Sequence, residues 1–346
     1  QWAERARPRV ILAGCGDGCR IVGTRLTLFL VLVGVCAFSE EPKPIRIASF
    51  NVYNFRPTHE KPPRDAEGFA ATIRALAELD ADIVVLQEMG SWDDFRLLQK
   101  RLRELGVDYP YLSLVYGADY TRHVAFLCKI KPAAEEHRTD RKYSLNGQEV
   151  KVRRGFGYLR FEIDDYVLHV LGAHLKSKVF HKLGQTDMRR YEARQLRYVI
   201  DELIDEDPLA NVLVLGDLND TMDSSPVKTV LYRRYKYTKR LYDLRPTAAN
   251  GESWTYHHSA SDTYSRIDYA LASFDLLPEV DLSQCRILSP SDGHKASDHR
   301  PFVVSIIPQN RKDESIREKF SREIREPVVR EAEPGKVFGT RKVLHE

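Results

Sequence analysis

Six short polar signatures, each at the end of an apolar run, form the strongest chemical pattern in the sequence. An unpaired polar group is costly at the end of a buried strand, so we expect these side chains to converge on one shared site. Two histidines, four carboxylates and two asparagines suit a hard cation combined with acid–base chemistry on a phosphate ester. The signatures are Ser49-Phe50-Asn51, Leu86-Gln87-Glu88, Ala173-His174-Leu175, Gly216-Asp217-Leu218-Asn219, Arg266-Ile267-Asp268-Tyr269 and Ser297-Asp298-His299.

Three of these signatures can be interpreted from residue chemistry alone. Glu88 offers a hard-cation ligand, although a salt bridge or a helix cap would use the same carboxylate. Asp217 and Asn219 are two residues apart, which places both side chains on one side of an extended segment; an Asx turn is the alternative. Asp268 bonded to His299 would fix the tautomer of the imidazole and support its charged form; a structural Ser-Asp-His turn is the alternative.

The elements that must position these residues alternate between strand and helix from residue 45 onward. Short buried runs predict strands, and an apolar period of 3.6 residues predicts helices. No repeat or linker interrupts residues 42–308, so we expect one α/β domain there. Strands are expected at residues 45–50, 83–86, 123–128, 212–215, 267–271 and 302–307, a hairpin at 158–163 and 166–174, and helices at 69–79, 93–105 and 187–204.

Residues 1–39 are predicted to be a leader that contains a signal peptide. Arg25 precedes an apolar run at residues 26–38, and residues 35–39 contain two small-x-small sequences typical of cleavage sites. The run is short for a membrane-spanning helix, so we expect export rather than an uncleaved anchor or a cytoplasmic protein, and no stable membrane span after cleavage. The chain begins with Gln1, and residues 1–20 match no export pattern, so we interpret them as an upstream artefact or a fragment boundary.

Charge is distributed unevenly along the chain. The net charge is +3, and residues 1–39, with five arginines and two acidic residues, account for all of it. Total charge therefore does not indicate a nucleic-acid partner, and any electrostatic footprint must be local. Residues 309–346 carry ten basic and eight acidic residues, which is typical of a solvated, partly disordered or helical tail, with partner binding as the alternative. Cys128 is expected to be a buried free thiol; a disulfide with Cys285 is the alternative.

In this order, the six signatures resemble those of the endonuclease/exonuclease/phosphatase superfamily, over residues 44–308. The resemblance implies a four-layer α/β sandwich, in which two mixed β-sheets pack face to face with helices on the outside. It also implies a metal-dependent phosphoester hydrolase that uses Mg²⁺, with Mn²⁺ as a substitute. Glu88 and Asp298 match the metal ligands of the family, and Asn51 matches a residue shared by the metal and the phosphate.

The resemblance also implies catalytic roles for five residues. Asp217 would position or activate the attacking water, and Asn219 would contact the phosphate. Asp268 and His299 would act together at the reacting phosphate, with His299 either accepting a proton or stabilising the transition state. His174 would face the leaving-group oxygen, as in deoxyribonuclease-like members. The His-Leu-Lys-Ser-Lys sequence that begins at His174 more closely resembles that of secreted bacterial nucleases.

Departures from the family patterns bear on the substrate. Arg154 matches a phosphate-contacting position, although Arg153 stands beside it. Inositol polyphosphate 5-phosphatases usually have an aromatic residue before Gly-Asp-x-Asn and a later Cys-Asp-Arg segment. Leu215 stands in place of the aromatic residue and Ser265-Arg266-Ile267-Asp268 in place of that segment, which argues against inositol phosphates. Lys176 replaces the glutamine typical of sphingomyelinase-like members, which argues less firmly against a choline lipid.

Residues 232–240 interleave three tyrosines with five cations, a composition that can follow a phosphate backbone and stack on bases. Packing of these tyrosines on the domain is the alternative. The sequence thus predicts an exported, monomeric phosphodiesterase and favours a nuclease, either endonucleolytic or exonucleolytic. A lipid or small-molecule phosphoesterase and a non-catalytic binding protein remain as alternatives. The candidate nucleic-acid contacts are Lys176, Arg233, Arg234, Tyr235 and Lys236.

Overall fold

The computed structural model describes residues 42–232, 239–311 and 315. The predicted signal peptide, nearly all of the charged tail and four candidate nucleic-acid residues (Arg233, Arg234, Tyr235 and Lys236) lie outside the described residues. Within the described part of the chain, no helix combines the length and the apolar character that a membrane crossing needs.

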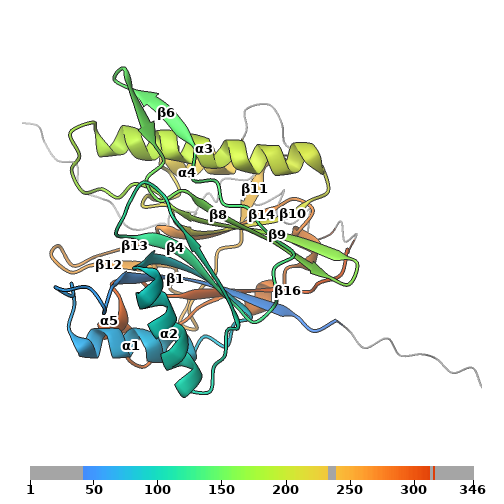
Figure 1. The fold of residues 1–346 in the computed structure, drawn as a ribbon. Helices are drawn as coiled ribbons and strands as arrows, with labels where there is room; N and C mark the ends of the chain where they lie inside the picture. The colour runs from blue at the N-terminus through green and yellow to red at the C-terminus, as the bar shows by residue number, and fades with distance from the viewer. Residues whose placement is uncertain (1–41, 233–238, 312–314, 316–346) are drawn as a thin grey trace, which may run out of the picture. The chain divides into compact units, whose positions relative to one another are not determined.

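Two six-stranded mixed sheets form the centre of the domain (Figure 1). The first has the order β15 (Arg286–Ile287), β16 (Phe302–Ile306), β1 (Ile45–Phe55), β2 (Ile83–Met89), β4 (His123–Cys128) and β3 (Tyr111–Val115). The second has the order β11 (Leu241–Asp243), β14 (Asp268–Ser273), β10 (Asn211–Asp217), β9 (Tyr166–His174), β8 (Phe156–Ile163) and β5 (Ala134–Glu135). Each sheet has one parallel pair, β1 with β2 and β9 with β10; the other neighbours are antiparallel.

Helices cover the outer face of each sheet (Figure 1). The first sheet carries α1 (Ala66–Ala77), α2 (Trp92–Glu104) and α5 (Gly293–Ala296), and the second carries α3 (Gln185–Glu206) and α4 (Ser225–Leu231). Two hairpins extend from this framework, β6 (Lys142–Leu145) with β7 (Gln148–Lys151) and β12 (Tyr256–His258) with β13 (Thr263–Ser265). Two 3₁₀ turns, η2 (Leu277–Glu279) and η3 (Leu282–Gln284), precede β15.

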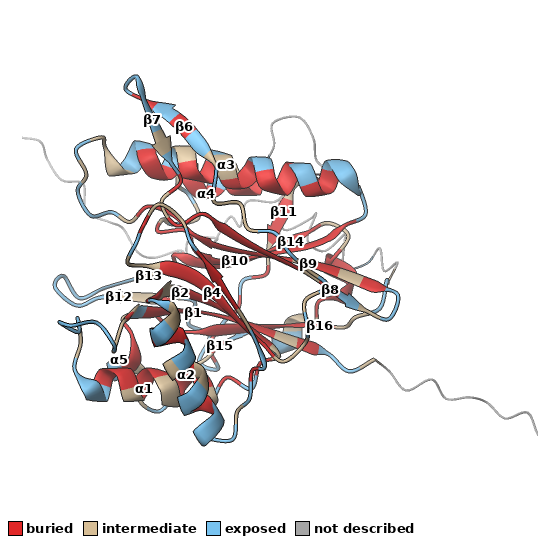
Figure 2. Cartoon of the chain, in the orientation of Figure 1, coloured by how far each residue is buried: buried red, intermediate tan, exposed pale blue. Residues whose placement is uncertain are grey.

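Three apolar cores hold these layers together, and buried residues fill the space between the sheets (Figure 2). The central core joins both sheets, with Phe126 from one and Leu213 from the other. A second core packs α3 and α4 on the second sheet, and a third packs α1 and α2 on the first. Burial of apolar surface on both faces of each sheet is the main stabilising term of such a sandwich. The predicted four-layer α/β sandwich is therefore confirmed.

Strand register brings the polar ends of three strands together. Asp217, the last residue of β10, pairs with Asp268 of β14 on one side and with His174 of β9 on the other. In the first sheet, Asn51 of β1 pairs with Gln87 of β2, next to Glu88. The backbone pairing of the strands alone thus places these polar residues side by side within each sheet.

The long periodic elements agree with the sequence prediction, whereas several short ones were missed. The expected strands and helices correspond to β1, β2, β4, β8, β9, β10, β14, β16, α1, α2 and α3. The missed elements include β3, α4 and both small hairpins, which are short or half-exposed and so lack a clear apolar period. Cys128 and Cys285 are both free and buried, as expected for Cys128.

Gly216 provides a test of how the strand end is built. Its φ is +138°, and a Cβ atom there would overlap the backbone carbonyl oxygen of Ala173 on β9. We expect Gly216→Ala to lower the free energy of unfolding, measured by urea denaturation, by at least about 3 kcal/mol, because the strand must shift. Gly251→Ala is the control, since it also has positive φ (+83°) but open space around it, and should cost only about 1 kcal/mol. Equal losses in the two variants would contradict this account.

Candidate active site

Asp217 lies at the centre of the candidate site. It is buried, and its Oδ2 accepts hydrogen bonds from Nδ2 of Asn51 (3.1 Å) and Nδ2 of Asn219 (3.1 Å). Its Oδ1 accepts the backbone N–H of Asn219 at 2.7 Å. Two imidazoles flank the same carboxylate, with Nε2 of His174 at 3.5 Å and Nε2 of His299 at 3.9 Å from Oδ2. Four of the predicted site residues, two asparagines and two histidines, therefore surround the carboxylate of Asp217.

The local geometry of Asn219 differs from the extended segment expected from the sequence. Asn219 has φ = +55°, and its backbone N–H bonds the Asp217 side chain two residues earlier, which is an Asx-type turn. The turn and the site are not alternatives, because the same bend points the Asn219 amide back at Asp217. Its Nδ2 also donates to the carbonyl of Leu175 (3.0 Å), which ties this turn to the segment after β9.

His299 and Asp268 form the predicted pair. Nδ1 of His299 lies 2.8 Å from Oδ2 of Asp268, and both side chains are buried. Burial alone would lower the pKa of His299, but the charge and hydrogen bond of Asp268, with smaller contributions from Asp217 and Asp298, raise it to about 10. The imidazole is therefore protonated at neutral pH, so Nδ1–H donates to Asp268, and Nε2 also carries a proton, 3.9 Å from Oδ2 of Asp217.

Ser297 connects this pair to the first sheet. Its hydroxyl accepts the backbone N–H of His299 (3.0 Å) and donates to the backbone carbonyl of Asn51 (2.7 Å). The Ser-Asp-His turn considered as a structural alternative thus exists, and it anchors His299 against the end of β1. The turn fixes the position of the imidazole relative to both sheets.

The carboxylates around His299 carry more negative charge than one imidazolium can balance. Burial raises the pKa of Asp217 to about 7; the charges of Asp268 and Glu88 also raise it, and that of His299 opposes them. Burial likewise raises the pKa of Asp298, against the opposing charge of His299. A cation bound beside these groups would relieve the repulsion.

Glu88 has the geometry of a constrained functional residue. Its φ is +63°, at an irregularity in the pairing of β2, and such backbone conformations are costly outside glycine. Its Oε2 accepts the backbone N–H of Asn54 at 3.0 Å and lies 3.7 Å from Nε of Arg122. Its Oε1 receives no hydrogen bond from any residue that the structure describes, so one oxygen is left to bind a ligand.

The donor set fits a divalent cation. Ligand atoms of Asp217, Asp268 and His299 lie within 4.8 Å of one another, which makes this cluster a candidate metal site among the described residues. Because the His299 ring is protonated and bonded to Asp268, it is a poor ligand, and we favour the oxygens of Glu88 and Asp298 instead. This choice agrees with the ligands implied by the family resemblance, and hard oxygen donors suit Mg²⁺ or Mn²⁺.

His174 lies beside Asp217, and Arg154 lies close to His174; both residues are buried. Arg154 is only 5% exposed, with Nε 3.2 Å from Oδ2 of Asp119 and Nη1 3.4 Å from the carbonyl oxygen of Leu175. Burial, followed by the charges of Arg154 and His299, holds the pKa of His174 well below its usual value, so this ring is neutral. Its Nδ1 is buried and has no hydrogen-bond partner among the described residues, and its Nε2 is the ring nitrogen that faces Asp217.

Lys176 does not lie where a nucleic-acid contact would require it. The residue is only 6% exposed, and its Nζ donates to the carbonyl oxygens of Val179 (2.8 Å) and Ser177 (3.1 Å). Burial, then the charges of Arg154 and Arg153, lower the pKa of Lys176 to about 8. Its ammonium closes the loop that follows β9, which argues against the expected exposed role.

Two buried residues of α3 that the sequence analysis missed hold the loops of the site together. Glu192 accepts the backbone N–H of Arg153 (3.1 Å) through Oε1 and that of Lys176 (2.6 Å) through Oε2. Arg189 donates from Nη1 to the carbonyl of Lys176 (3.1 Å) and from Nε to Oδ2 of Asp220 (2.9 Å). One helix face therefore clamps the segments that carry Arg154, His174 and Asn219. A charged pair on the apolar face of this helix was the available signal in the sequence.

The geometry agrees with the comparison with known proteins. The sequence profile described as the Endonuclease/Exonuclease/phosphatase family matches residues 48–299. The chain belongs to this family. It is accordingly a metal-dependent phosphoester hydrolase, and the Asp/His cluster fits the catalytic site of such an enzyme. No match was found among curated proteins.

Solved structures with the same fold share little sequence with this chain. Beta toxin 275-280 from Staphylococcus aureus is 17% identical, with a TM-score of 0.54 over 75% of this chain and 99% of that one. An endonuclease/exonuclease/phosphatase from Bacteroides vulgatus is 15% identical, with a TM-score of 0.54 over 77% of this chain and 100% of that one. Truncated TDP2 from Caenorhabditis elegans is 16% identical, with a TM-score of 0.51 over 76% and 98%. These similarities support the fold.

The α3 clamp leads to a prediction about catalysis. In Glu192→Gln the new amide N–H would face a backbone N–H, so one buried donor loses its acceptor and the loop segments shift. We expect kcat to fall at least about tenfold, because small displacements of reacting groups are costly, while thermal unfolding shows a loss of about 1–3 kcal/mol. Glu202→Gln, on the same helix but in an exposed ion pair with Arg141, is the control. A Glu192→Gln enzyme with the kcat of this control would refute the positioning role.

Proposed function

We propose that this protein is an exported, Mg²⁺-dependent phosphodiesterase that cleaves nucleic acid. The observation that supports catalysis most directly is the convergence of Asn51, Asn219, His174 and His299 on the buried carboxylate of Asp217. A binding protein on the same scaffold would not require such a network, because burying polar groups is costly and ionisable groups with strongly perturbed pKa values cluster at functional sites.

The proposed reaction is the attack of water on a phosphodiester. Asp217 orients the water and accepts its proton, since a carboxyl with a pKa of about 7 is matched to neutral solution. The His299 imidazolium, held by Asp268, stabilises the negative charge that develops on the phosphate oxygens. The second N–H of the Asn51 amide would be available to the same oxygens, because only one is donated to Asp217. Both N–H groups of the Asn219 amide are already donated, to Asp217 and to the carbonyl of Leu175, so Asn219 acts on the phosphate by holding Asp217. Mg²⁺, or Mn²⁺ in its place, would be held by Glu88 and Asp298 with Asn51, and would neutralise phosphate charge.

His174 and Arg154 complete the proposed site on the side of the second sheet. A neutral His174, whose Nε2 lies 3.5 Å from Oδ2 of Asp217, can bond the leaving-group oxygen through this nitrogen without adding charge. Arg154 brings a positive charge close to His174, and its ion pair with Asp119 and its hydrogen bond to the carbonyl of Leu175 hold the guanidinium in place. We infer that Arg154 acts on the phosphate through this fixed charge.

Cleavage of defined substrates tests this function. We expect purified protein to cleave plasmid and oligonucleotide DNA with Mg²⁺ or Mn²⁺ and to lose this activity in EDTA. His299→Ala, Asp217→Ala and Glu88→Ala should each lower turnover at least about 100-fold, in line with general acid–base and electrostatic contributions. Turnover of sphingomyelin or small phosphate monoesters, without cleavage of DNA or RNA, would replace the nuclease proposal with the lipid or small-molecule alternative. A His299→Ala protein of near wild-type activity would refute the site.

Export can be tested separately from chemistry. A signal peptide at residues 26–38 predicts that the secreted protein begins just after Ala37 or just after Ser39. N-terminal sequencing of protein recovered outside the cell is the measurement. A membrane-bound product that retains residues 26–38 would favour the uncleaved anchor, and a product starting within residues 1–20 would refute the interpretation of those residues.

A further inference from the structure

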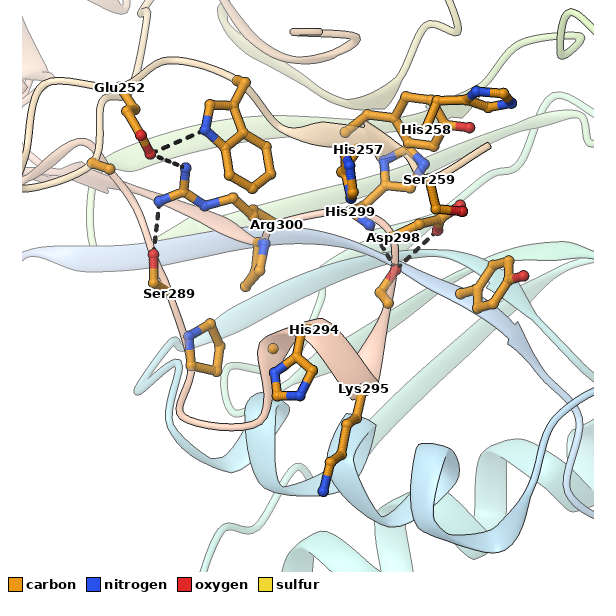
Figure 3. A pocket seen from close by; sticks show the side chains of 18 of the residues that line it. Glu252, His257, His258, Ser259, Ser289, His294, Lys295, Asp298, His299 and Arg300 are labelled. Atoms are coloured by element: carbon orange, nitrogen blue, oxygen red, sulfur yellow. Dashed lines mark hydrogen bonds and ion pairs between the residues drawn. The ribbon is translucent and has the colours of Figure 1, made fainter. Parts of the chain in front are cut away.

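A cavity of about 810 Å³ opens directly beside the candidate active site (Figure 3). Asp298 and His299 lie at one end of it, and Arg300 with Glu252 lies toward the other. One side is formed by the β12 strand and the turn after it, including His257 and His258, and the facing side by residues 289–294. Binding sites for small molecules have volumes of about 300–1,000 Å³, so this space suits a whole substituent of the phosphate rather than the phosphate alone.

The far end of the cavity is fixed by a bridge between its two sides. The guanidinium of Arg300 lies 4.2 Å from the ring centroid of Trp254, and Nη1 lies 3.2 Å from Glu252. Its Nη2 donates to the hydroxyl of Ser289 on the facing side at 2.7 Å. Trp254 in turn donates to Glu252 at 3.0 Å. Four side chains thus hold the two sides at a set separation.

The near end is linked to the catalytic histidine. Tyr256 forms a backbone bridge with His299, and the centroids of their two rings are 4.8 Å apart. The next residue, His257, stacks on Tyr264 of β13 with ring centroids 4.3 Å apart and an angle of 13° between the planes. This side of the cavity is therefore built of flat rings, held by the hairpin and joined to His299.

We propose that this cavity receives one unpaired nucleoside next to the scissile phosphate, so that the enzyme prefers single-stranded to duplex nucleic acid. The proposal rests on the proposed nuclease function. Flat rings stack on nucleobases of any sequence, and histidine and serine side chains offer donors and acceptors to base edges. A base inside a duplex is stacked and paired, and it must leave the helix before it can enter such a space.

A choline headgroup fits this cavity less well. Quaternary ammonium groups bind over open aromatic faces, but one face of Trp254 is already covered by the guanidinium of Arg300. A second cation there would also lie beside Arg300, whose charge is paired with that of Glu252. The contacts at the far end therefore favour a neutral, flat group over a cation.

The test compares a 12-residue single-stranded oligonucleotide with the same strand annealed to its complement, and uses methyl p-nitrophenyl phosphate as a small diester. We expect kcat/KM to be at least tenfold higher on the single strand than on the duplex. Ala249 lies exposed on the cavity wall, so Ala249→Trp should fill the space. The ratio of kcat/KM on the oligonucleotide to that on the small diester should then fall at least tenfold. Leu209→Trp, which places the same indole in an exposed turn just before β10, should leave this ratio unchanged.

Three other outcomes would each contradict a different part of this proposal. Equal cleavage of single strand and duplex, with no effect of Ala249→Trp on the ratio, would refute the nucleoside site while leaving the nuclease function intact. Cleavage of the small diester without cleavage of either oligonucleotide would refute the nuclease function itself. Hydrolysis of sphingomyelin vesicles that Ala249→Trp abolishes would assign the cavity to a lipid headgroup instead.

Discussion

The register of three neighbouring strands in the second sheet is the constraint on which the rest of the site depends. Because Asp217 pairs with His174 on one side and Asp268 on the other, the sheet itself brings two carboxylates and an imidazole to one edge. A shift of one residue in this pairing would turn every side chain to the opposite face. Gly216 permits the close approach of β9 that the register requires.

Residues from the first sheet complete the site across the sandwich. Asn51 reaches Asp217 from the end of β1, and Ser297 bonds the same segment while holding His299. The apolar core between the sheets therefore has a functional consequence, because it fixes the distance over which these polar groups meet. On the outer side, α3 adds a charged clamp to the loops that the sheet cannot reach.

The sequence predicted the long elements and the chemistry well, for identifiable physical reasons. Buried strands such as β4 and β10 are continuous apolar runs, and the polar residues at their ends were conspicuous because such groups are costly there. The side-chain turns of Asn219 and Ser297 were foreseen only as alternatives to function, whereas the fold uses each turn to aim a functional group.

Other features of the site could not be predicted, because they depend on contacts between distant segments. The burial of Lys176 arises from a loop that closes over its ammonium, and no local pattern signals such a closure. Glu192 meets two backbone segments from other parts of the chain, and Arg300 meets Glu252 and Ser289 only after the cavity walls are in place. The spacing of residues within one segment carries no information on contacts between segments that are far apart in the sequence.

The central claim is that Asp268 keeps the His299 imidazolium charged and oriented at the reacting phosphate. The most direct measurement is the single-turnover cleavage rate of Asp268→Asn at saturating Mn²⁺, together with its thermal stability. The account predicts cleavage at least about 100-fold slower than that of the wild type in a protein that remains folded. A folded Asp268→Asn protein that cleaves at the wild-type rate would contradict it.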